Sequence, residues 1–183
     1  MMTFMPSSRG ALYELAEPRS GWLLASDAIA AGVTRQQLSR YAKSGVLVRS
    51  THGVYRLRDF PAHPFEDAIE ACLWAGPDAV ASHDTALAIY GLGDTMPASI
   101  HITVPHRLRK QRPGVIVHVA PIVLAATASR DGVPITTVIQ TIRDTATDAT
   151  VDVVASIIHD AETRGLVRRR EATALRKELA VQR

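Results

Sequence analysis

Residues 29–57, IAAGVTRQQLSRYAKSGVLVRSTHGVYRL, predict the architecture of the N-terminal part of this chain. Gly32-Val33 forms a tight turn, after which Thr34 is placed to cap a helix that ends at Gly45. From Val46 the apolar period changes to two, and His52-Gly53 separates two such runs, which predicts a β-hairpin. The stretch therefore predicts a turn, a helix and a β-hairpin, in that order.

Two helical segments precede this stretch. Leu12 and Leu15 lie one turn apart in a short helix over 11–17 that Pro18 ends. Ser26-Asp27 is expected to cap the helix that carries Ile29. Helix, helix, turn, helix and hairpin is the order of a winged helix-turn-helix, which we assign to residues 1–60.

The third helix presents a polar face without carboxylates. At 100° per residue, its polar side chains fall within an arc of about 140°, opposite Leu38, Tyr41 and Ala42. The arc consists of Arg35, Gln36, Ser39, Arg40 and Lys43. Guanidinium, amide and hydroxyl groups read base edges in the major groove, and cations hold phosphates. This face therefore predicts DNA binding.

Charge is concentrated in the same region. The chain has a net charge of +3. Residues 1–60 hold eight Lys/Arg against four Asp/Glu, and residues 28–58 hold six basic side chains and no acidic one. A basic stretch of this kind is typical of a protein that binds the phosphate backbone, although a solvated basic face has the same composition.

A second domain follows the proline-bearing linker at 60–64. Helices are expected over 65–74, 82–90, 138–147, near 150–165 and over 170–181. The strands IHITV (100–104) and VIVHV (115–119) are joined by a basic loop. Pro134-Ile135-Thr136-Thr137 is expected to lead into a helix from about Val138 to Thr147. The fold class is therefore α+β: a winged helix-turn-helix followed by a larger mixed α+β domain over 64–183.

Composition narrows the class of protein. With 46% apolar and 21% charged residues, the 183-residue chain can build a buried core. No apolar run is long enough to span a bilayer, and MMTFMPSSRG lacks the pattern of a signal peptide. The single cysteine, Cys72, leaves no internal disulfide and no multi-cysteine zinc site. We expect a cytoplasmic protein without membrane association.

The stretch 29–57 resembles the N-terminal domain of AbiEi-type antitoxins. The residues that carry this likeness are Gly32, Leu38, Gly45, Leu47, Arg49, Gly53, Val54 and Tyr55. Three later segments resemble the C-terminal part of the same family: ASHDTALAIYGL (81–92), IHITVP (100–105) and GVPITTVIQTIRDTA (132–146). Asp84-Thr85 and Ile139-Gln140 depart from that pattern.

The resemblance implies two roles. The N-terminal domain would bind double-stranded DNA at promoter repeats and repress its own operon, and the C-terminal domain would counteract a co-encoded, nucleotidyltransferase-like toxin. The expected DNA-binding residues are Thr34, Arg35, Gln36, Ser39, Arg40, Lys43, Arg49, His52 and Arg56. Two further basic groups are candidates for phosphate or partner contacts: Arg107, Arg109, Lys110 and Arg112, and Arg168 and Arg169 beside Arg164 and Arg170.

We expect no enzyme, metal or cofactor. His101, His106 and His118 have no accompanying carboxylate or cysteine at ligand spacing. His83 and Asp84 are interpreted as surface groups in the first turn of a helix capped by Ser82. The strands lack the acid and lysine of a nuclease.

Three alternatives remain. One is a stand-alone regulator whose second domain senses a ligand or protein, which the absence of a neighbouring toxin gene would favour. Another is a DNA-targeted nuclease, which metal-dependent hydrolysis would reveal. The third is a winged helix that binds protein, which would show no affinity for DNA even at low salt.

Overall fold

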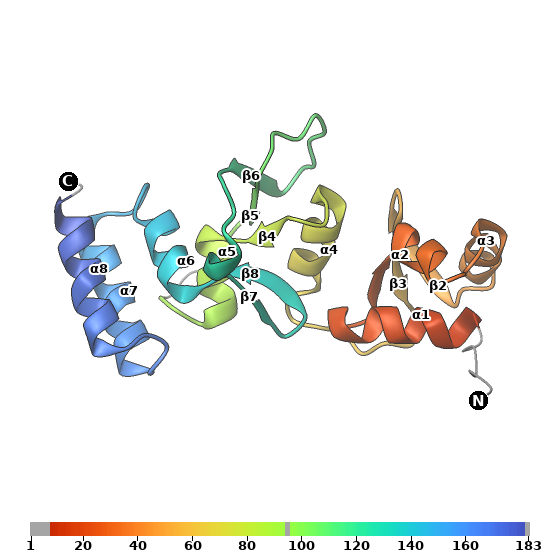
Figure 1. The fold of residues 1–183 in the computed structure, drawn as a ribbon, viewed down its shortest axis with the longest axis horizontal. Coiled ribbons are helices and arrows are strands. Elements are labelled where there is room, and N and C mark those ends of the chain that lie inside the picture. The colour runs from red at the N-terminus through yellow and green to blue at the C-terminus, as the bar shows by residue number, and fades with distance from the viewer. Residues whose placement is uncertain (1–7, 94–95, 182–183) are drawn as a thin grey trace. The chain divides into compact units, whose positions relative to one another are not determined.

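The computed structural model describes residues 8–93 and 96–181. Their contacts divide the chain into two compact units (Figure 1). The N-terminal unit extends to Pro77 and includes residues 131–133, and the C-terminal unit comprises 78–130 and 134–183. The sequence places the domain boundary earlier, in the linker at 60–64. The difference arises from one helix, α4 (Glu66–Ala75), which packs on the strands of the N-terminal unit.

The N-terminal unit contains the helices and hairpin expected of a winged helix, in the expected order. Its elements before α4 are α1 (Ser8–Ala16), a 3-10 turn (Glu17–Arg19), β1 (Trp22–Leu24), α2 (Ala25–Ala30), α3 (Arg35–Lys43), β2 (Leu47–Thr51) and β3 (Val54–Leu57). The predicted hairpin is confirmed, because β2 and β3 pair antiparallel. The additional strand β1 pairs antiparallel with β3, which gives a sheet of order β1-β3-β2.

One apolar core holds these elements together. Leu12, Leu23, Leu38, Leu47 and Leu57 come from five different elements and are each at most 3% exposed. Burying a leucine side chain contributes about 1.5–3 kcal/mol. The apolar side of α3 is therefore fixed against α2 and the sheet, and its polar side faces solvent.

The predicted cap of α2 is wrong. The helix begins at Ala25, its N-cap residue is Leu24, and no side chain caps it. The Ala25 backbone N–H instead donates to the Gly53 carbonyl of the hairpin turn at 2.8 Å. Asp27 accepts a hydrogen bond from the Arg19 guanidinium at 2.8 Å. A tertiary contact thus replaces the local cap at this helix start.

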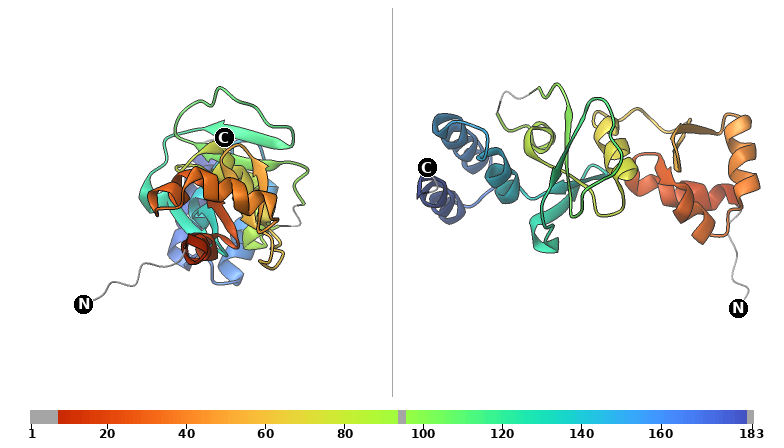
Figure 2. Two further views of the ribbon diagram at one scale, coloured as in Figure 1. Left: turned by 90° about the vertical axis from the view of Figure 1, so that its right-hand side faces the viewer. Right: turned by 90° about the horizontal axis from the view of Figure 1, so that it is seen from above.

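The C-terminal unit combines a mixed sheet with four helices in its described part (Figures 1 and 2). Its strands are β4 (Val80–Ala81), β5 (Ile100–Val104), β6 (Val115–Val119), β7 (Thr127–Arg130) and β8 (Val133–Thr136). Its helices are α5 (His83–Tyr90), α6 (Val138–Thr145), α7 (Val151–Thr163) and α8 (Arg169–Val181), with a 3-10 turn at Leu124–Ala126.

The five strands lie in the order β6-β5-β4-β8-β7. β4 is antiparallel to β5 and parallel to β8, and β5 is parallel to β6. The strands predicted at 100–104 and 115–119 are confirmed. The helix expected from about Val138 is confirmed, because α6 begins there with Thr137 as its cap residue. The strand β8 over 133–136, just before it, is not predicted by the sequence pattern.

Helices α7 and α8 run side by side, as Figures 1 and 2 show, and contact each other along their length. Gly165 has a φ of 70° in the turn between them, a conformation that favours glycine. Ile158 and Leu175, at most 2% exposed, form part of the core beneath the pair. Within the described residues, no helix is both long enough and apolar enough to cross a membrane.

Candidate nucleic-acid interface

Helix α3 begins at a reciprocal cap. The Thr34 hydroxyl accepts a hydrogen bond from the Gln37 backbone N–H at 3.2 Å, and the Gln37 side-chain oxygen accepts one from the Thr34 N–H at 2.8 Å. The pair satisfies two backbone donors that a helix otherwise leaves unbonded. The predicted cap is therefore confirmed, and it fixes the point at which α3 starts.

The polar arc predicted for α3 lies on the exposed side of the helix. All five of its residues are exposed: Arg35, Gln36, Ser39, Arg40 and Lys43. On the opposite side Leu38 is 3% exposed, and Tyr41 packs against the core. With nine residues at 1.5 Å each, α3 is about 13 Å long. This length is similar to the width of the major groove, about 12 Å.

The hairpin adds two exposed basic side chains beside its turn. A guanidinium nitrogen of Arg49 lies 3.1 Å from His52 Nδ1. The register between β2 and β3 shifts between Arg49 and Thr51, and Gly53 has a φ of 78° in the turn. The bulge and the left-handed glycine shape the turn end of the hairpin. Arg49 and His52 lie side by side at this end.

Arg56 does not join this exposed set. Its guanidinium donates to the carbonyls of Leu57, Phe60 and Pro61 at 2.9–3.3 Å and lies 3.2 Å from a Glu66 carboxylate oxygen. Its side chain is only 18% exposed. We therefore revise the expectation that Arg56 contacts DNA: in this structure it ties β3 to the linker and to α4.

Three carboxylates of the N-terminal unit lie close to cations outside α3. Asp27 pairs with Arg19, and Glu66 with Arg56. Asp59 lies 3.7 Å from Arg9, and the hydrogen bond from the Tyr13 hydroxyl lowers the pKa of its carboxyl. Their negative charge is thus partly neutralised, and α3 itself carries cations and no carboxylate.

Residues 11–58 match the family model of AbiEi antitoxins, described as transcriptional regulators. The matched residues contain most of α1 together with α2, α3 and the hairpin, and the predicted resemblance of the N-terminal domain is therefore confirmed. The match supports a regulatory role of the toxin–antitoxin kind.

Among solved structures, the chain is similar to the crystal structure of the RV2827C protein from Mycobacterium tuberculosis. Sequence identity is 15% and the TM-score 0.38, over 94% of this chain and 81% of the other. A TM-score of this size supports no argument about function. No curated protein matches the chain.

The two further basic groups lie outside the matched residues 11–58, in the C-terminal unit. Arg107, Arg109, Lys110 and Arg112 occupy the connection from β5 to β6, and Arg168 and Arg169 stand at the start of α8. Arg164 contacts the Gly91 carbonyl and lies 3.5 Å from Asp160, so it stabilises the end of α5.

Three histidines meet in the C-terminal unit. His101 Nδ1 lies 3.1 Å from His118 Nε2, and the His83 ring stacks on His118 with a centroid distance of 3.6 Å. The interpretation of His83 as a surface group is therefore wrong. Ser82 is fully buried and bonds Thr103 rather than capping the helix, and His83 has a left-handed φ of 49°. His106 lies outside this cluster, in the exposed loop after β5.

The histidine cluster does not have the geometry of a metal site. The rings of His83 and His118 are within 13° of parallel. A metal ion binds in the plane of an imidazole, and two stacked rings share no such plane. In the part of the chain that the structure describes, no group of three or more potential ligand side chains is arranged to hold a metal. Burial and the neighbouring imidazoles instead lower the pKa values of His83 and His118.

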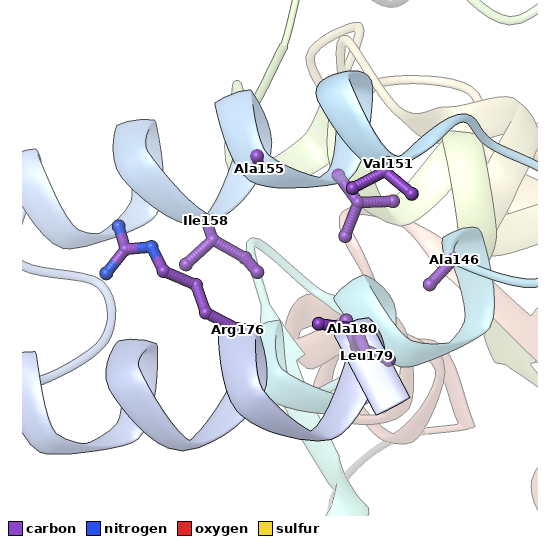
Figure 3. A pocket seen from close by; sticks show the side chains of 8 residues that line it. Ala146, Val151, Ala155, Ile158, Arg176, Leu179 and Ala180 are labelled. Atoms are coloured by element: carbon purple, nitrogen blue, oxygen red, sulfur yellow. The ribbon is translucent and has the colours of Figure 1, made fainter. Parts of the chain in front are cut away.

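An apolar pocket lies between α7 and α8, beside the residue that follows α6 (Figure 3). Its lining consists of Ala146, Val151, Val154, Ala155, Ile158, Arg176, Leu179 and Ala180. The Arg176 guanidinium bonds Glu162 at 2.8 Å, which leaves the aliphatic part of its side chain to line the pocket. The site suits an apolar ligand or side chain.

Proposed function

We propose that this protein is a DNA-binding regulator of the antitoxin type. It binds promoter repeats of its own operon through α3 and the hairpin wing. The observation that carries this proposal is the exposed, carboxylate-free arc of α3 within a domain that matches AbiEi antitoxins.

In this proposal, residues at the two ends of α3 have different roles: those at one end contact bases and those at the other contact phosphates. Arg35, Gln36 and Ser39 lie nearest the N-terminal end, which points at base edges when such a helix docks, and so they read sequence. Arg40 and Lys43 in the last turn, with Arg49 on the hairpin, hold phosphates. The Thr34 hydroxyl is engaged with Gln37, so Thr34 positions the helix.

In this proposal the C-terminal unit counteracts a toxin encoded beside the protein. The support is the resemblance of its sequence segments to the C-terminal part of AbiEi antitoxins, which also points to a nucleotidyltransferase-like toxin. Co-expression with the neighbouring gene product tests this half of the proposal. Growth rescue by the full chain supports it, and unchanged toxicity contradicts it.

A gel-shift titration on the protein's own upstream DNA tests the DNA half. The control is random DNA of equal length, and both are measured at two salt concentrations. Tight, salt-sensitive binding that prefers the upstream sequence is expected. Equal and weak binding to both DNAs at low salt would leave only a basic surface.

The second candidate function is a stand-alone regulator whose C-terminal unit senses a small molecule. The apolar pocket between α7 and α8 favours it, because its lining suits an apolar ligand (Figure 3). A ligand bound there that alters DNA affinity, in a chain with no toxin gene beside it, would distinguish this regulator from an antitoxin.

A further inference from the structure

Strand β6 forms an outer edge of the five-stranded sheet. Its inner side is satisfied by β5: Ile100 N–H donates to the Gly114 carbonyl at 2.8 Å, and Ala120 N–H to the Val104 carbonyl at 3.1 Å. In a parallel ladder alternate residues bond to the same neighbour. The backbone groups of 116 and 118 therefore face β5, and those of Val117 and Val119 face away from the sheet.

A groove runs along this outer edge. It is lined by Val115, Val117 and Val119 on one side, and by residues of the β5–β6 connection, 107–113 except Arg109, on the other. Val119 is 55% exposed, and the neighbouring Ile116 is 43% exposed. Exposed, apolar edge strands are uncommon in stable proteins, because they pair readily with other chains.

The charge around the groove is of one sign. Residues 96–130 include Arg107, Arg109, Lys110 and Arg112 and contain no aspartate or glutamate. Arg107 and Lys110 line the groove itself and are exposed. An extended segment that enters the groove thus meets backbone donors and acceptors, apolar side chains and positive charge together.

We propose that the β6 edge binds an acidic, extended segment of a partner protein as an added strand. Such a segment supplies carbonyls and N–H groups to Val117 and Val119, apolar side chains to the valines, and carboxylates to the basic loop. A nucleic-acid backbone supplies phosphate acceptors for the loop and leaves the valines and the outward carbonyls unpaired. This interaction is independent of the DNA binding proposed for α3.

The test uses the full chain and three labelled peptides of ten residues. One alternates glutamate and valine, one alternates lysine and valine, and one keeps the acidic composition but carries two central prolines. Fluorescence polarisation should show that the first peptide binds at least about tenfold more tightly than each of the other two. In NMR titrations, the amide signals of Val117 and Val119 should shift.

Two variants link binding to the edge. Val117→Pro removes an outward N–H, a position where edge strands tolerate proline, and should weaken the acidic peptide at least about tenfold. Val117→Thr keeps the N–H and serves as its control. The paired change Arg107→Ala and Lys110→Ala should weaken binding without touching the strand, which covers the case in which the proline variant misfolds.

Several results would overturn the proposal. Equal binding of the alternating and proline-bearing acidic peptides would reduce the site to a charged surface. Failure of all peptides would mean that the loop cations only keep other chains off the edge. Tighter binding of a ten-nucleotide single-stranded DNA, lost in the Arg107 and Lys110 variant, would assign the groove to nucleic acid. In each case DNA binding by α3 would stand or fall on its own gel-shift result.

Discussion

Removing one positive charge from the N-terminal unit should have different effects at two positions: it should change the salt dependence of DNA binding at one position and the stability of the fold at the other. Lys43 is exposed in the last turn of α3, whereas the Arg56 guanidinium bonds three carbonyls and Glu66. The charge change is the same for Lys43→Ala and Arg56→Ala. The comparison therefore separates a phosphate contact from a structural contact.

The expected magnitude follows from the number of phosphate contacts. We assign three cations to phosphates, Arg40, Lys43 and Arg49, so log K should fall with log salt at a slope of about −2.7 for each bound chain. Between 50 and 200 mM salt, affinity should drop about 40-fold for the wild type. With Lys43→Ala the slope becomes about −1.8, and the drop about 12-fold.

For Arg56→Ala the slope of log K against log salt should stay near the wild-type value, whereas the free energy of unfolding should fall. Charge-assisted hydrogen bonds to carbonyls contribute about 1.5–3 kcal/mol, so the melting temperature should fall by at least about 4 °C. Lys43→Ala should change it little, because an exposed cation at a helix end contributes about 0.3–1 kcal/mol at most.

The assay is fluorescence anisotropy on the upstream DNA at five salt concentrations, with thermal unfolding measured in the same buffers. An unchanged slope with Lys43→Ala would refute the placement of the last turn of α3 on the backbone. A reduced slope with Arg56→Ala and no loss of stability would refute the inward position of that guanidinium.

Three further predictions address the reading face, the helix cap and the histidine cluster. Arg35→Ala should cost about 1–3 kcal/mol on the specific site and relax the base preference, as a binding-site selection would measure; an unchanged preference contradicts base contact. Thr34→Ala should lower the free energy of unfolding by about 0.5–2 kcal/mol in urea titrations, while Thr34→Ser retains the cap. Because burial lowers the pKa of His118 below the ~6.5 of a free imidazole, the unfolded state takes up its proton first, and stability present above that pH should be lost as pH falls. His118→Gln should flatten this loss between pH 7.5 and 5.5, and an equally steep fall in the variant would show that other groups cause it.

Local patterns predicted much of the N-terminal unit. Thr34 stands where the pattern predicts the cap of α3, and the hairpin alternates around His52-Gly53. The polar arc of α3 also followed from helical spacing alone. These features depend on contacts within a few residues, so the sequence is sufficient to locate them.

Short strands were missed for a physical reason. β1 has three residues and β4 has two, too few to establish an alternating period. Their place in the sheets depends on partners far along the chain, such as the pairing of Trp22 with Arg56. β8 was hidden because its residues, 133–136, adjoin a helix whose own pattern is strong.

By itself the sequence determined the helical face that is proposed to read DNA, because 3.6-residue periodicity places Arg35, Ser39 and Lys43 on one side whatever the rest of the chain does. Which basic side chains stay exposed beside that face, and which surfaces the C-terminal unit presents, depends on tertiary contacts. Arg56 turns inward because carbonyls of the linker and a carboxylate of α4 surround it. His83, His101 and His118 meet because α5, β5 and β6 pack together, and an edge of the sheet is left open because β6 is its outermost strand. Contacts between segments that are distant in the sequence depend on no local pattern, and therefore residue spacing does not predict them.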